Sequence, residues 1–152
     1  MMINLISKYK NIDQIEVADL IKDYSVKTLK EWGLVVEMGL IVSEENVYFY
    51  KTITPESLFS LLFLSPTFKL EDLDVCAFAF KFSNYQIKSL THLLSTTKLH
   101  PPGTWVLSNK PIEMEIAHYK AKLLKYQDLN SRLRVKLLSS DSNKHKVKGI
   151  FK

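Results

Sequence analysis

The segment "EVADLIKDYSVKTLKEWGLVVEMGLIVSEENVYFY", residues 16–50, determines how the first third of the chain is expected to fold. Its apolar residues Leu29, Trp32 and Val36 follow the i, i+3, i+7 spacing of one helix face. Ser25 stands where its hydroxyl can cap the start of that helix. Gly39 comes just after the last apolar position, where a left-handed residue often ends a helix. The segment therefore predicts a capped helix from Ser25 to about Val36.

Strand-like sequence follows this helix. The runs "LIVS" and "VYFYKT" flank Glu44-Glu45-Asn46, which predicts two β-strands and a tight turn. Before the helix, residues 2–10 predict a short helix. Asn11 or Asp13 can cap a second helix that carries Ile15, Val17 and Leu20.

This order of elements resembles the winged helix-turn-helix domain of bacterial and archaeal transcription regulators. The resemblance rests on Glu16-Val17-Ala18, on Ser25 and Thr28-Leu29, on Gly39-Leu40-Ile41 and on "VYFYKT", and it covers about the first third of the chain. Ala18 is expected to be small because two helices cross there. The resemblance implies that the third helix enters the DNA major groove. The residues it would present are Ser25, Lys27, Thr28, Lys30 and Glu31, and residues 44–47 would add wing contacts.

Three features of the segment depart from this pattern. Gly33 occupies a position where such domains carry a packing leucine. The expected DNA-reading helix contains no Arg, the commonest reader of guanine. Glu44-Glu45 at the wing tip would repel phosphate. Residues 1–54 carry a net charge of −2, residues 55–110 carry +1 and residues 111–152 carry +6. The same fold used as a protein-interaction module is therefore the alternative.

The rest of the chain is expected to be helical. Thr54-Pro55-Glu56 is a typical helix start, and that helix should end before Ser65-Pro66. Residues 70–82 fit either a strand or a buried helix, and the helix is favoured. A further helix capped by Ser83 or Asn84 should run to about residue 99, and "HPPGTW" should break the chain. "TWVLS" could form a short strand.

A last helix is predicted from Pro111 to about Leu138. Apolar residues recur along it in alternating steps of three and four, as in a coiled-coil seam, with Asn130 at a position that can fix register. The seam residues are Ile112, Ile116, Tyr119, Leu123, Tyr126, Asn130, Leu133 and Leu137. Two interpretations stay open: a homodimer through this seam, or a helix that packs on its own domain. As a third option, its cations contact nucleic acid directly, the candidates being Lys120, Lys122, Arg132, Arg134 and Lys136.

Signals for other classes of protein are weak. The single cysteine, Cys76, lies in the apolar run "DVCAFAF", which predicts a buried structural residue, and it excludes an intramolecular disulfide. The four histidines lack metal-ligand spacing, and no phosphate-binding or nucleophile motif is present. No apolar run reaches the ~18 residues of a membrane span. We therefore expect no metal, no cofactor, no enzyme activity, no membrane partner and a cytoplasmic location.

The sequence thus predicts a mainly α protein in three parts. Residues 1–54 would form a winged helix-turn-helix of three helices and a two-stranded β-wing. Residues 55–139 would form a helical domain with the long amphipathic helix, and residues 140–152 a basic flexible tail. The leading functional hypothesis is a dimeric transcriptional regulator that binds double-stranded DNA. The alternative is an adaptor or inhibitor that binds another protein.

Overall fold

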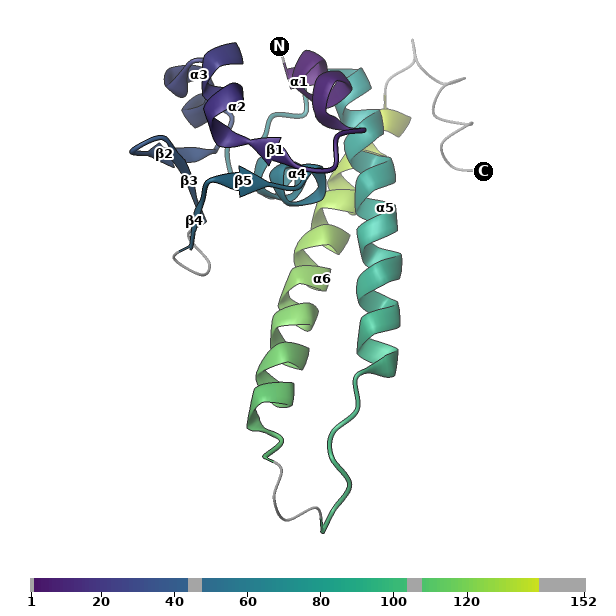
Figure 1. Cartoon of the computed structure of the whole chain (residues 1–152). Helices are drawn as coiled ribbons and strands as arrows, with labels where there is room; N and C mark the ends of the chain where they lie inside the picture. The colour runs from purple at the N-terminus through teal and green to yellow at the C-terminus, as the bar shows by residue number, and fades with distance from the viewer. Residues whose placement is uncertain (1, 44–47, 104–107, 140–152) are drawn as a thin grey trace. The chain divides into compact units, whose positions relative to one another are not determined.

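The computed structural model describes residues 2–43, 48–103 and 108–139, and it divides the chain into two compact units, Met1–Val75 and Cys76–Lys152 (Figure 1). The protein is mainly helical, with small antiparallel sheets and a long C-terminal helix. The first unit extends past residue 54, where the sequence had placed a domain boundary, and it includes the helix that begins at Pro55.

The first unit alternates short helices with short strands. In chain order its elements are α1 (Met2–Tyr9), β1 (Ile15–Glu16), α2 (Val17–Asp23), α3 (Val26–Glu31), β2 (Val35–Glu37), β3 (Leu40–Ser43), β4 (Tyr48–Tyr50), β5 (Thr52–Ile53) and α4 (Pro55–Phe63). Buried apolar residues come from most of these elements and form its core, among them Leu5, Leu20, Leu29, Ile41 and Leu58.

The second helix begins later than predicted. Ile15 and Glu16 form β1, which pairs with β5 through Ile15 opposite Ile53. The backbone N–H of Val17 continues this pairing by donating to the carbonyl of Lys51 at 3.0 Å. Glu16, rather than Asn11 or Asp13, is therefore the residue before α2. Ala18 is exposed on this helix, so the expectation that it lies at a helix crossing is wrong.

The third helix ends earlier than predicted, and Gly33 is the reason. Its φ of +96° lies in the left-handed region, and the amide of Leu34 donates to the carbonyl of Leu29 across the turn. Gly33 therefore terminates α3 and is not a mid-helix packing residue. Gly39 is also left-handed, but it forms the β2–β3 turn together with Met38, whose φ is +54°.

Val36 is thus in a strand rather than a helix, and the two predicted strands belong to a three-stranded sheet in the order β2-β3-β4. Val42 on the central strand stands opposite Val35 on one side and Phe49 on the other. Ile41 points to the other face of the sheet and is fully buried.

Two helices of the remaining chain begin at side-chain caps. The hydroxyl of Thr54 caps α4 by accepting the Ser57 amide, and Pro55 occupies the first turn. Asp72 accepts the amides of Asp74 and Val75 where α5 (Leu73–Thr96) begins. The helix favoured for residues 70–82 is therefore confirmed from Leu73 onward. It does not stop at Ser83, which is buried inside α5 and donates to the Phe80 carbonyl at 2.9 Å.

In the second unit, α5 from Cys76 onward and α6 (Lys110–Leu138) run antiparallel and side by side (Figure 1). The predicted last helix is thus confirmed to within one residue. The side-chain amide of Asn130 joins the two helices by donating to Ser83 Oγ and to Asn84 Oδ1, each at 2.8 Å. The rings of Phe82 and Tyr126 meet edge to face at 6.1 Å. Cys76 is fully buried, as predicted.

Candidate nucleic-acid interface

The candidate residues of the first unit lie together on α3 and on the residue that caps it. Ser25 Oγ accepts the Thr28 amide at 3.1 Å and lies 2.8 Å from the Thr28 hydroxyl. Both hydroxyls therefore take part in the cap. Leu29 anchors the helix in the core with no exposed surface. The other residues of the helix are exposed or half-buried.

Three charged side chains of α3 face solvent. Lys27, Lys30 and Glu31 are exposed, as is Ser25, while Thr28 is half-buried. Residues three and four apart lie on one side of a helix, so Lys27 has both Lys30 and Glu31 as neighbours. Val26 adds an apolar contact surface that is 44% exposed. The helix therefore presents a small face with one net positive charge.

Two aromatic side chains bracket this helix. Tyr24 lies just before the Ser25 cap and Trp32 just after Glu31, and their ring centroids are 5.5 Å apart. Both side chains are half-buried, and partial burial raises the pKa of Tyr24. Trp32 thus packs on Tyr24. The ring pair joins the residues that flank the two ends of α3.

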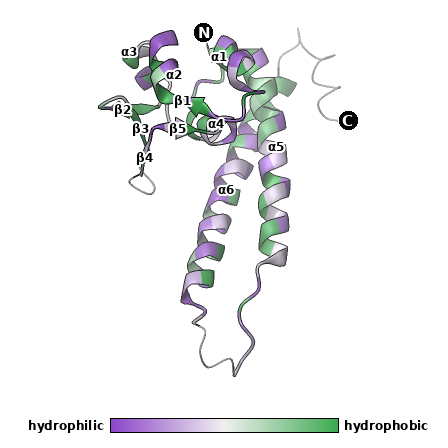
Figure 2. Cartoon of the chain, in the orientation of Figure 1, coloured by the Kyte–Doolittle hydropathy of each residue, from purple (hydrophilic) through white to green (hydrophobic). Residues whose placement is uncertain are grey.

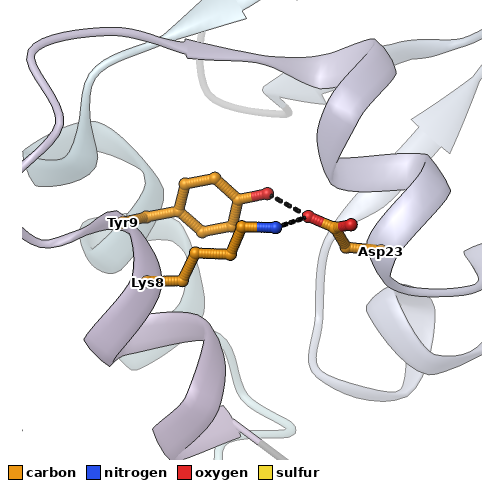
Figure 3. A network of polar contacts seen from close by, with 3 residues as sticks. All are labelled: Lys8, Tyr9 and Asp23. Atoms are coloured by element: carbon orange, nitrogen blue, oxygen red, sulfur yellow. Dashed lines mark hydrogen bonds and ion pairs between the residues drawn. The ribbon is translucent and has the colours of Figure 1, made fainter.

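A network of polar contacts ties α1 to α2, next to α3 in the chain (Figure 3). Asp23 accepts hydrogen bonds from Lys8 Nζ and from the Tyr9 hydroxyl, the latter at 2.8 Å. These two bonds hold the pKa of Asp23 below its ordinary value, and the bond from Lys8 has the larger effect. Burial and the bond to Asp23 raise the pKa of Tyr9. Sequence reasoning missed this network because it joins residues fourteen and fifteen positions apart through the fold.

The seam predicted on the last helix makes contacts within the chain. Tyr126, Leu133 and Leu137 are buried, and Asn130 and Tyr126 contact α5. The seam residues in the first half of α6 are half-buried, namely Ile112, Ile116, Tyr119 and Leu123. These contacts agree with the interpretation in which the helix packs on its own domain. A homodimer through the same residues stays a prediction.

The cations proposed for nucleic-acid contact lie along α6. Lys120, Arg132 and Arg134 are exposed, while Lys122 and Lys136 are half-buried. Arg132 Nε donates to Asp128 one helical turn earlier, at 3.1 Å. These cations belong to a different unit from Lys27 and Lys30. The predicted wing tip, residues 44–47, and the possible strand at residues 104–107 lie outside the described residues.

Within the described ranges, no group of three or more His, Cys, Asp or Glu side chains is arranged to hold a metal ion. Over the same ranges, no helix is both long and apolar enough to cross a membrane. No family model, curated protein or solved structure matches this chain.

Proposed function

We propose that this protein is a DNA-binding transcriptional regulator whose first unit is a winged helix-turn-helix domain. In this proposal α2 and α3 form the helix-turn-helix, and β3 with β4 forms the hairpin of the wing. Helix α3 enters the major groove, with Lys27 and Lys30 facing the DNA.

The observation that carries the proposal is the exposure of Lys27 and Lys30 on a helix that is fixed on its other side. Leu29 anchors α3 in the core, Ser25 caps it, and Tyr24 packs on Trp32 across its two ends. A rigid element with an exposed cationic face suits readout of a groove, where side chains must be held in register with base edges. The pairing of β1 with β5 joins the strand before α2 to the strand after the hairpin.

One observation favours the alternative of a protein-binding adaptor. The first unit contains seven Lys and twelve Asp or Glu, a net charge of −5. Non-specific DNA affinity comes largely from cations that neutralise phosphates. The first unit would therefore gain little affinity from its overall charge, and its DNA binding would depend on the local face of α3.

The experiment that tests the proposal is selection of DNA sites from random duplexes by the full chain, followed by titration of a selected site over a salt series. Changing both Lys27 and Lys30 to Ala should abolish preference for that site. It should also flatten the dependence of affinity on salt, because two cations at the DNA surface are lost.

The matched control changes Lys10 and Lys69 to Ala. Both are exposed in the same unit, and the pair removes the same charge. The control protein should keep its preference for the selected site. The regulator proposal is excluded if no site is enriched, or if the Lys27→Ala/Lys30→Ala protein binds the selected site like the control. The alternative of a protein-binding adaptor then remains.

A further inference from the structure

Helix α6 carries a second stripe of seam positions, separate from the one that packs on α5. The residues recur in alternating steps of three and four and are Met114, Ala117, Ala121, Leu124, Asp128, Ser131, Val135 and Leu138. All eight are exposed. Four are large apolar side chains that are more than half exposed: Met114 (66%), Leu124 (66%), Val135 (68%) and Leu138 (55%). We call this set the outer stripe.

The outer stripe faces away from α5. With about 100° of rotation per residue, Leu124 and Val135 lie about 120° and about 140° from Asn130 around the helix. Asn130 is the residue that bonds to Ser83 and Asn84 of α5. The two stripes therefore occupy largely separate faces of α6. Apolar residues recur between hydrophilic ones along the whole helix (Figure 2).

Single exposed apolar side chains are normal on protein surfaces. The outer stripe differs because its spacing spans 25 residues in the pattern of a coiled-coil seam. Small Ala117 and Ala121 continue it between Met114 and Leu124, so a partner helix could approach closely. The stripe therefore has the geometry of an unfilled helix-docking face.

Charges beside the outer stripe indicate which helix fits it. The positions that border a seam are the e and g positions, which pair with a partner's charges. On α6 these positions hold the cations Lys120, Lys125, Arg132 and Arg134 and one acid, Glu113. Asp128, inside the stripe, accepts a hydrogen bond from Arg132, which offsets its charge.

A second copy of α6 does not fit these borders. In a parallel pair, Lys120 would stand opposite Lys125 of the second copy. In an antiparallel pair with Met114 opposite Leu138, Lys120 would face Arg134 and Lys125 would face itself. Both arrangements place like charges together, which destabilises a coiled coil.

We infer that the outer stripe of α6 binds an amphipathic helix of another protein, with a 3–4 apolar seam bordered by Glu or Asp. The partner's apolar residues would cover Leu124, Val135 and Leu138, and its acids would face Lys120 and Lys125. This site goes beyond the proposed DNA binding and does not depend on it.

The test is titration of the full chain with a labelled synthetic helix of four heptads, with Leu at both seam positions and Glu at the e and g positions. A second peptide carries Lys in place of each Glu. The acidic peptide should bind at least about tenfold more tightly than the basic one. Binding should weaken by about tenfold or more when Leu124 and Val135 are both changed to Gln, because two covered apolar side chains are lost.

The matched control is Met38→Gln, which changes a 97% exposed apolar residue in the other unit and should leave binding unchanged. Circular dichroism should give the same helical signal for all variants, since the changed residues are exposed. Equal affinity for both peptides, or equal binding by the Leu124→Gln/Val135→Gln protein, overturns the inference. It is also overturned if the wild type sediments as a dimer and this variant as a monomer, or if the stripe binds phosphatidylserine vesicles but not the acidic peptide.

Discussion

Gly33 is a residue on which the shape of the first unit depends. An added Cβ would lie 1.9 Å from Ser65 Oγ and 2.5 Å from Ser65 Cβ, and the φ of +96° would strain any L-residue. Ser65 cannot easily move away, because its Oγ accepts the Thr67 amide and lies 2.8 Å from the Thr67 hydroxyl. Gly33 therefore does two things: it turns the chain out of α3, and it lets the segment after α4 pass close by.

We predict that Gly33→Ala lowers the free energy of unfolding by about 2–5 kcal/mol, the sum of left-handed strain and overpacking. Gly39→Ala is the matched control, since Gly39 is also left-handed but its Cβ would meet nothing within 4 Å. It should cost only about 1–2 kcal/mol. Urea denaturation of both variants measures the difference, and equal losses would show that the collision with Ser65 is relieved without cost.

Asp23 gives a pH-dependent prediction at the same scale. Its folded-state pKa lies below the ordinary value of 3.8, mainly because of the hydrogen bond from Lys8. The stability that it contributes is therefore present above about pH 4 and is lost as the pH falls through the folded pKa. Asp23→Asn should lower the urea midpoint at about pH 6, and its difference from wild type should shrink toward about pH 3.

The control for this series is Asp19→Asn. Asp19 is exposed on the same helix, and the substitution removes the same charge. Its effect at about pH 6 should be smaller, because the bonds from Lys8 and Tyr9 to Asp23 are kept. A difference between Asp23→Asn and wild type that stays constant from about pH 6 to about pH 3 would contradict the role given to Asp23.

At the scale of elements, the α5–α6 pair depends on Asn130. Its amide donates to Ser83, which is fully buried, and to Asn84. Each such bond contributes about 0.5–1.5 kcal/mol. We predict that Asn130→Ala lowers the free energy of unfolding by about 1–3 kcal/mol in urea, whereas Gln127→Ala, exposed on the same helix, changes it by less than about 0.5 kcal/mol. Similar losses in the two variants would mean that apolar contacts alone hold the pair.

The elements also mark the limit of what the sequence could predict. The starts of α3, α4 and α6 were predicted because their signals are local: a Ser or Thr cap, or a proline in the first turn. The end of α3 was missed because Trp32 and Val36 continue a helical spacing that Gly33 interrupts. The pairing of Ile15 with Ile53 was missed because it joins residues 38 positions apart.

The candidate site was predicted to a similar extent. The positions of Ser25, Lys27, Thr28, Lys30 and Glu31 on one capped helix follow from sequence spacing. The contacts that fix this helix, Tyr24 on Trp32 and Lys8 with Tyr9 on Asp23, depend on chain segments that only the fold brings together. The outer stripe of α6 follows from spacing alone, but a second, more apolar seam runs along the same helix.

At the scale of the whole molecule, the two units carry opposite charges. The first unit has a net charge of −5, while the second has fourteen Lys or Arg and four Asp or Glu, a net charge of +10. Residues 75–112 contain no Asp or Glu. Sequence-blind attraction to a polyanion should therefore come from the second unit, and any base preference from α3.

This separation predicts different effects for two double variants of equal charge. Changing the exposed Lys81 and Lys88 of α5 to Ala should weaken binding to selected and random DNA equally. Changing Lys27 and Lys30 should remove most of the preference between the two. Competition titrations at fixed salt measure, for each variant, the ratio of its affinities for selected and random DNA. If the Lys81/Lys88 variant loses the preference for selected DNA and the Lys27/Lys30 variant keeps it, base readout belongs to the second unit.

The single cysteine of the chain has a practical consequence. Cys76 has no exposed surface in the folded protein, so a thiol reagent can reach it only when the structure around it opens. The dependence of the labelling rate on reagent concentration then gives the free energy and the rate of that opening, without a mutation. The natural sequence thus offers a single reactive site, whose labelling rate reports local unfolding at the start of the second unit.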